Sequence, residues 1–65
     1  MLIEGNRVAS HREWALLDVR RKREQAAEAR RLAQLITLKT DRDALLAQAA
    51  DLEARADQIE RQLKT

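Results

Sequence analysis

The stretch Ile36-Thr37-Leu38-Lys39-Thr40-Asp41-Arg42-Asp43 decides whether this 65-residue chain forms one helix or two. Its first five residues are the most β-branched segment of the sequence, and β-branched side chains lose rotamer freedom in a helix. Thr40 can cap a helix that follows it. Asp41 and Asp43 would then lie in the first turn, where the helix dipole favours negative charge. These placements predict a second helix that begins near residue 41.

The rest of the chain consists mainly of helix-forming residues. It has no proline, and its only glycine is Gly5. Ser10-His11-Arg12-Glu13 has the pattern of a capping box, in which the Ser and Glu side chains each bond to the other residue's amide. We therefore expect an all-α chain with a flexible tail over residues 1–9 and a helical hairpin over residues 10–65. The two helices are expected at about 11–37 and 41–63.

Apolar residues recur at heptad spacing in both halves of the chain, but in two different frames. The frame that runs from Leu35 to Leu63 differs by two residues from the frame that suits the first half. Neither a three-residue nor a four-residue insertion gives that offset, so a break between two helices is the simpler explanation. The expected helix–helix interface consists of Leu16 (or its neighbour Ala15), Val19, Ala26, Ala29, Ala33, Ile36, Leu45, Ala49, Leu52, Ala56, Ile59 and Leu63.

Folding the chain back after Leu38 gives a consistent antiparallel pairing of the two halves. Small residues then face large ones along much of the interface, as in closely spaced helices. The basic run over residues 20–23 comes to lie opposite Asp57 and Glu60. An antiparallel hairpin, or antiparallel coiled coil, is therefore the expected fold. Two straight helices that cross near residue 38 would make nearly the same contacts, so a single long helix in a dimeric coiled coil is the alternative.

The chain is poor in bulky residues, with one Trp, no Phe and no Tyr. A domain of this size buries only about 60% of the surface that its unfolded chain exposes, and small scaffolds usually need an oligomer or another staple. We therefore expect a homo-oligomer, most simply a dimer that forms a four-helix bundle, and a protein partner. The residues expected to form this second interface or to dock the partner are Trp14, Leu17, Leu35, Leu38 and Leu46.

The sequence offers few groups for catalysis or metal binding. Cysteine is absent, and the only histidine, His11, has no acidic residue three or four positions away. There is also no glycine-rich phosphate loop. We expect no catalytic residue, no metal and no cofactor, and hence no enzyme. The chain starts without a basic leader and has no run of about 20 apolar residues, which leads us to expect a cytoplasmic protein without a membrane span.

A basic segment over residues 20–31 carries six Lys or Arg and two Glu. Lys and Arg can contact the phosphates of nucleic acids without reading the sequence. Here they are spread round the helix and mixed with acids, which is typical of a solvated, salt-bridged face. The expected function is a coiled-coil protein–protein interaction module of the adaptor, co-chaperone or assembly-factor kind. The alternative is a nucleic-acid-binding coiled-coil dimer that contacts phosphates through Arg20, Arg21, Lys22, Arg23, Arg30 and Arg31.

Overall fold

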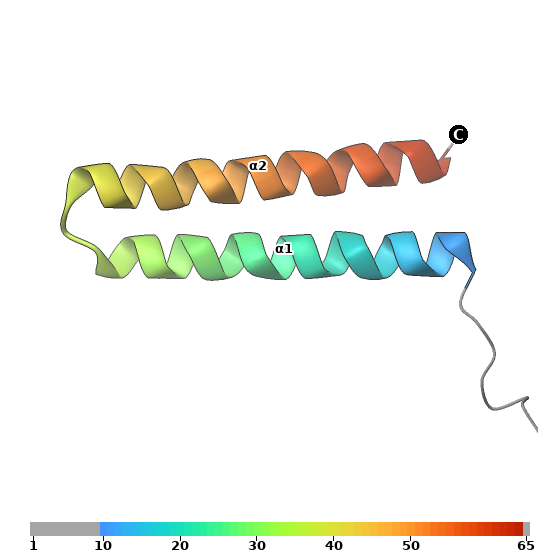
Figure 1. Cartoon of the computed structure of the whole chain (residues 1–65), viewed down its shortest axis with the longest axis horizontal. Helices are drawn as coiled ribbons and strands as arrows, with labels where there is room; N and C mark the ends of the chain where they lie inside the picture. The colour runs from blue at the N-terminus through green and yellow to red at the C-terminus, as the bar shows by residue number, and fades with distance from the viewer. Residues whose placement is uncertain (1–9, 65) are drawn as a thin grey trace, which may run out of the picture.

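The computed structural model describes residues 10–64, which form an antiparallel helical hairpin (Figure 1). Helix α1 spans His11–Leu35 and helix α2 spans Lys39–Lys64, and the chain reverses direction between them. No strand occurs in this range. The predicted all-α hairpin is therefore confirmed, and the alternative of one long straight helix is wrong. The predicted tail, residues 1–9, lies outside the described residues, as does Thr65.

Helix α1 begins at the capping box that the sequence predicts. The backbone N–H of Glu13 donates to Oγ of Ser10 at 3.2 Å, and the N–H of Ser10 donates to Oε1 of Glu13 at 2.8 Å. The backbone of Ser10 is extended, with φ −69° and ψ 165°, as is usual for the residue that caps the start of a helix. The carboxylate of Glu13 also places negative charge in the first turn, where the helix dipole stabilises it.

The turn between the helices lies two residues earlier in the chain than the sequence predicts. Helix α1 ends at Leu35, and Ile36 is extended, with its N–H donating to the carbonyl of Ala33 at 3.3 Å. Helix α2 begins at Lys39, because the carbonyl of Leu38 already accepts from the N–H of Arg42 at 3.0 Å. The break itself is therefore made by extended backbone at a β-branched residue. No residue of the described chain has a positive φ, so the turn needs no glycine.

The predicted cap at Thr40 is wrong. Thr40 lies inside α2, and the position before the first helical residue belongs to Leu38, whose side chain cannot accept a hydrogen bond. Starting the helix earlier closes additional backbone hydrogen bonds, and it brings Lys39 Nζ to 2.7 Å from Oδ2 of Asp43 one turn later. Asp41 still lies in the first turn, as predicted.

The contact between the helices is built on alanine. Val19 and five alanines are the buried apolar residues of the described chain: Ala26, Ala29, Ala33, Ala49 and Ala56. Ala49 and Ala56 are fully buried, at 0% exposure, and no larger side chain among residues 10–64 reaches full burial. Leu45 and Leu52 pack against this cluster from positions that are half-buried. Small side chains at the contact let two helices approach closely, whereas larger ones would hold them apart.

Eleven of the twelve residues expected at the helix–helix interface are buried or half-buried. The exception is Leu16, which is 43% exposed, while its neighbour Ala15 is half-buried beside Ile59 and Leu63. Adjacent residues of an α-helix differ by about 100° in direction, so only one of the two can face α2. The heptad count allowed either residue, and the structure places the smaller one in the contact.

Candidate interaction surface

Along one edge of the hairpin, two arginines of α1 form ion pairs with carboxylates of α2. Arg23 Nη2 lies 3.1 Å from Oδ1 of Asp57 and also bonds to the carboxylate of Glu60. Arg30 makes a bidentate pair with Glu53, at 3.1 Å from Nε and 2.7 Å from Nη2. The predicted pairing of the basic run with Asp57 and Glu60 is present through Arg23 alone. These charged contacts link the two antiparallel helices along this edge.

The cross-helix pairs perturb the groups that form them. Hydrogen bonds from Arg30 hold the pKa of the Glu53 carboxyl below its ordinary value, and the same contact raises the pKa of Arg30. The pKa of Arg23 is raised by its hydrogen bonds to Asp57 and Glu60. In each case the ionised form is the one that makes the contact, so the pairs are fully formed at neutral pH.

The other basic residues of the 20–31 segment bond within α1, except one. Arg20 pairs with Glu24 at 3.8 Å, and Arg31 pairs with Glu28 one turn before it. Lys22 pairs with Asp18 at 2.7 Å, which leaves that ammonium mostly covered. Among the basic residues of this described segment, only Arg21 has no ion pair, and it is exposed.

Large apolar side chains lie on the surface of α1, away from α2. Trp14 is 57% exposed and Leu17 is 45% exposed near the start of the helix, and Leu32 and Leu35 are 42% and 79% exposed near its end. Trp14, Leu17 and Leu35 are three of the residues expected in a second interface. The structure thus leaves the bulkiest apolar groups of this helix in contact with solvent.

These side chains and two charged ones form a single line along α1, which we call the outer stripe. Trp14, Arg21, Glu28 and Leu35 are spaced seven residues apart, and the two remaining members lie beside that line. At about 100° per residue, all six fall within a sector of about 60°, centred about a third of a turn away from the alanines that face α2. All are exposed. The outer stripe comprises Trp14, Leu17, Arg21, Glu28, Leu32 and Leu35.

The other exposed leucines lie elsewhere. Leu16 points to a different side of α1, in a hollow that Glu13, Leu17 and Arg20 also line. Leu46 lies on α2, beside Arg30 and Arg42. Leu38, at 60% exposure, is in the turn. The expected second interface is therefore divided between the outer stripe, which holds Trp14, Leu17 and Leu35, and two separate positions.

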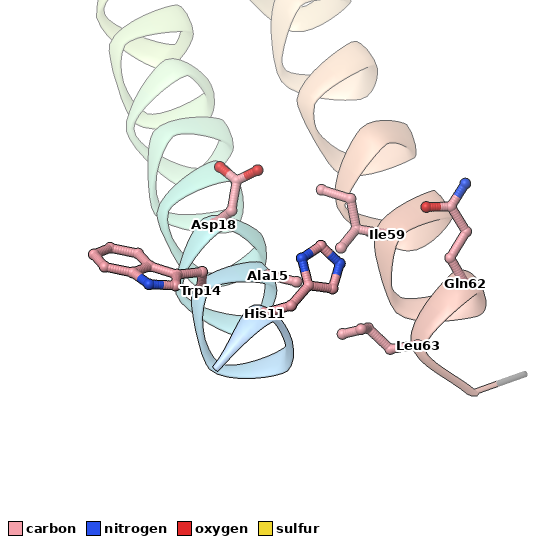
Figure 2. Close-up of a pocket in the computed structure, with 7 residues that line it drawn as sticks. All are labelled: His11, Trp14, Ala15, Asp18, Ile59, Gln62 and Leu63. Atoms are coloured by element: carbon pink, nitrogen blue, oxygen red, sulfur yellow. The ribbon is translucent and has the colours of Figure 1, made fainter. Parts of the chain in front are cut away.

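A hollow at the open end of the hairpin joins the start of α1 to the end of α2. Its lining residues are His11, Trp14, Ala15, Asp18, Ile59, Gln62 and Leu63. Figure 2 shows the His11 ring between the two helices, while the Trp14 ring points away from α2. Arg12 adds a contact at this end by donating to the carbonyl of Leu63 at 3.3 Å. Residues 10–64 contain no group of three or more His, Cys, Asp or Glu that could hold a metal ion.

Sequence reasoning missed the outer stripe although its signal was present. Carried backward, the heptad frame of the second half passes through Arg21 and Glu28, and their charges marked this frame as unsuitable for a seam in α1. It is unsuitable for the contact with α2, since both side chains are exposed. The same seven-residue spacing instead places these residues on a second line along α1, which faces away from α2. Reading charged members as part of a heptad would have found it.

Comparisons of this chain with models of protein families, with curated proteins and with solved structures find no match. Neither described helix is long and apolar enough to cross a membrane.

Proposed function

We propose that the protein is a non-enzymatic interaction module, a helical hairpin that self-associates and docks a protein partner through apolar helix faces. One observation carries the proposal: the largest apolar side chains of α1 are exposed, while the buried contact is made mainly by alanine. Exposed apolar side chains gathered along one face mark contact surfaces. An adaptor, co-chaperone or assembly factor would use such a face. We place it in the cytoplasm, which agrees with the absence of cysteine.

The nucleic-acid alternative receives less support from the charges. Five of the six basic side chains that would contact phosphate are already paired with carboxylates of the same chain, and Arg23 and Arg30 hold the two helices together. A phosphate would have to compete with these carboxylates. Only Arg21 is exposed without such a pair, and a single phosphate contact gives little affinity at physiological salt.

Sedimentation equilibrium at two protein concentrations, with and without duplex DNA, tests the proposal. We expect the mass to rise above the 7.5 kDa of one chain as concentration increases, and the melting temperature to rise with it. Monomer mass at both concentrations, with melting that does not depend on concentration, would overturn self-association. Submicromolar DNA binding whose log affinity falls with log salt, at about −0.9 per phosphate contacted, would establish the alternative instead.

A further inference from the structure

The outer stripe has a symmetry that identifies its occupant. The first and last members, Trp14 and Leu35, are equally distant from the midpoint between Glu24 and Gln25. Leu17 and Leu32 are also equidistant from it, and so are Arg21 and Glu28. The three pairs are therefore centred on the same point of α1. Two of them are apolar, and the third combines opposite charges. A surface that is complementary to itself under a two-fold rotation is what an isologous dimer requires.

We infer that the outer stripe binds the outer stripe of a second copy of this chain, with the two α1 helices antiparallel and the two-fold axis passing between Glu24 and Gln25. In this register Trp14 lies opposite Leu35 of the second copy, and Leu17 lies opposite Leu32 of the second copy. Arg21 lies opposite Glu28 of the second copy. Because of the symmetry, each of these contacts occurs twice. The inference rests on the proposed self-association and specifies its surface, orientation and register.

The charges of Arg21 and Glu28 favour the antiparallel register over a parallel, in-register one. Arg21 has no ion pair in the described chain, and the exposed Glu28 has one local partner, Arg31, so its carboxylate can accept a second cation. In a parallel, in-register dimer, Arg21 would face Arg21 and Glu28 would face Glu28, and like charges across an interface oppose association. In the antiparallel register both charges meet their opposites. Measured around the axis of α1, the face that contacts α2 lies about a third of a turn from the outer stripe. The second copy therefore leaves the ion pairs of Arg23 and Arg30 with α2 intact.

Charge reversal at Arg21 and Glu28 tests the register. Arg21→Glu alone places two like-charged carboxylate pairs in the homodimer, and Glu28→Arg alone places two like-charged cationic pairs there. We expect each variant to raise the dimer Kd by about tenfold or more, because two attractive pairs become repulsive. A mixture of the two variants forms a heterodimer in which both pairs are complementary again. The mixture should therefore associate about as tightly as the unchanged protein.

Arg20→Glu is the matched control, since it makes the same change in charge one residue away and about a quarter turn off the stripe. It should leave the dimer Kd within about twofold of that of the unchanged protein, because it alters only the local pair with Glu24. Circular dichroism of all variants at a concentration where they are monomeric checks that the hairpin is kept. Sedimentation of each variant and of the mixture then measures association.

The outcomes separate this inference from the proposed function. If the unchanged protein associates but the mixture of variants does not recover association, the register is wrong while self-association stands. Equal effects of Arg20→Glu and Arg21→Glu would likewise overturn the register. If the unchanged protein stays monomeric at every concentration, both the proposed self-association and this inference are wrong. Recovery in the mixture, together with an inert Arg20→Glu, is the result we expect.

Discussion

The two apolar surfaces of α1 differ in the size of the side chains that form them. The surface that faces α2 carries Ala26, Ala29 and Ala33, which are buried, while the outer stripe carries Trp14 and Leu35, which are 57% and 79% exposed. A fold that used its bulkiest groups for its own core would have the opposite distribution. In this hairpin, small side chains permit close approach within the chain, and large ones are left on the surface for another molecule.

The largest expected effect comes from enlarging the alanine contact. Ala49→Leu should destabilise the hairpin by about 3 kcal/mol, because Ala49 is fully buried and an added isobutyl group must push the helices apart. Urea unfolding at a concentration where the protein is monomeric measures the change. Ala50→Leu, at the neighbouring exposed position, is the control and should be nearly neutral. Equal effects at the two positions would show that the alanine contact does not set the helix separation.

A leucine-to-alanine substitution should destabilise the hairpin more at the contact between the helices than on the outer stripe. Leu52→Ala removes a half-buried side chain that packs on Ala26, Ala29 and Ala49, and should cost about 2 kcal/mol of hairpin stability. Leu35→Ala removes a mostly exposed side chain and should cost less than about 0.5 kcal/mol. Thermal melts at low concentration compare the two. A larger loss for Leu35→Ala would mean that the outer stripe takes part in the fold of one chain.

Dimer formation should depend on the outer stripe and not on the exposed leucine of α2. Leu35→Ala should raise the dimer Kd by about tenfold, because it removes the apolar partner of Trp14 of the second copy. Trp14 is the only tryptophan, so a shift of its emission to shorter wavelength reports burial as concentration increases. Leu46→Ala, an exposed leucine of α2, is the control and should leave this titration unchanged. An equal effect of Leu46→Ala would place α2 in the interface.

The smallest expected effect is on the charged edge and depends on pH. The pKa of Glu53 is lowered in the folded hairpin by its hydrogen bonds with Arg30, so its contribution to stability is present above the unfolded pKa and is lost as pH falls through the folded pKa. Glu53→Gln should therefore lower the melting temperature slightly at pH 7. The difference from the unchanged protein should shrink as pH falls below the ordinary pKa of a glutamate.

Asp51→Asn is the control for this measurement, because Asp51 pairs only with Arg55 of the same helix. Any effect of Asp51→Asn at pH 7 should be smaller than that of Glu53→Gln, since it leaves the contact between α1 and α2 intact. A pH-independent difference for Glu53→Gln would show that the Arg30–Glu53 pair does not stabilise the hairpin.

Local signals were enough for much of the fold. The capping box at Ser10 forms as its pattern predicts, since every group it needs lies within four residues. The break predicted within the Ile36–Thr40 segment is confirmed, and it is confined to residues 36–38. Both bounds of the turn lie two residues earlier than predicted, because Ile36 is already extended and the carbonyl of Leu38, not the side chain of Thr40, accepts the first bond of α2.

The sequence by itself predicted two helices, their antiparallel order and most of the residues that join them, because propensity, capping and heptad spacing can be read from the chain, but it left a single long helix as the alternative that the structure excludes. Only the tertiary structure decided that Ala15 and not Leu16 faces α2, that Arg23 and Arg30 cross to α2 while Arg21 is left unpaired, and that Leu32 lies outside. Heptad counting identifies the residue that faces a neighbouring helix only to within about one position, which corresponds to about 100° around the helix axis. The position of the second helix resolves that choice, and with it the surface that stays exposed for a partner.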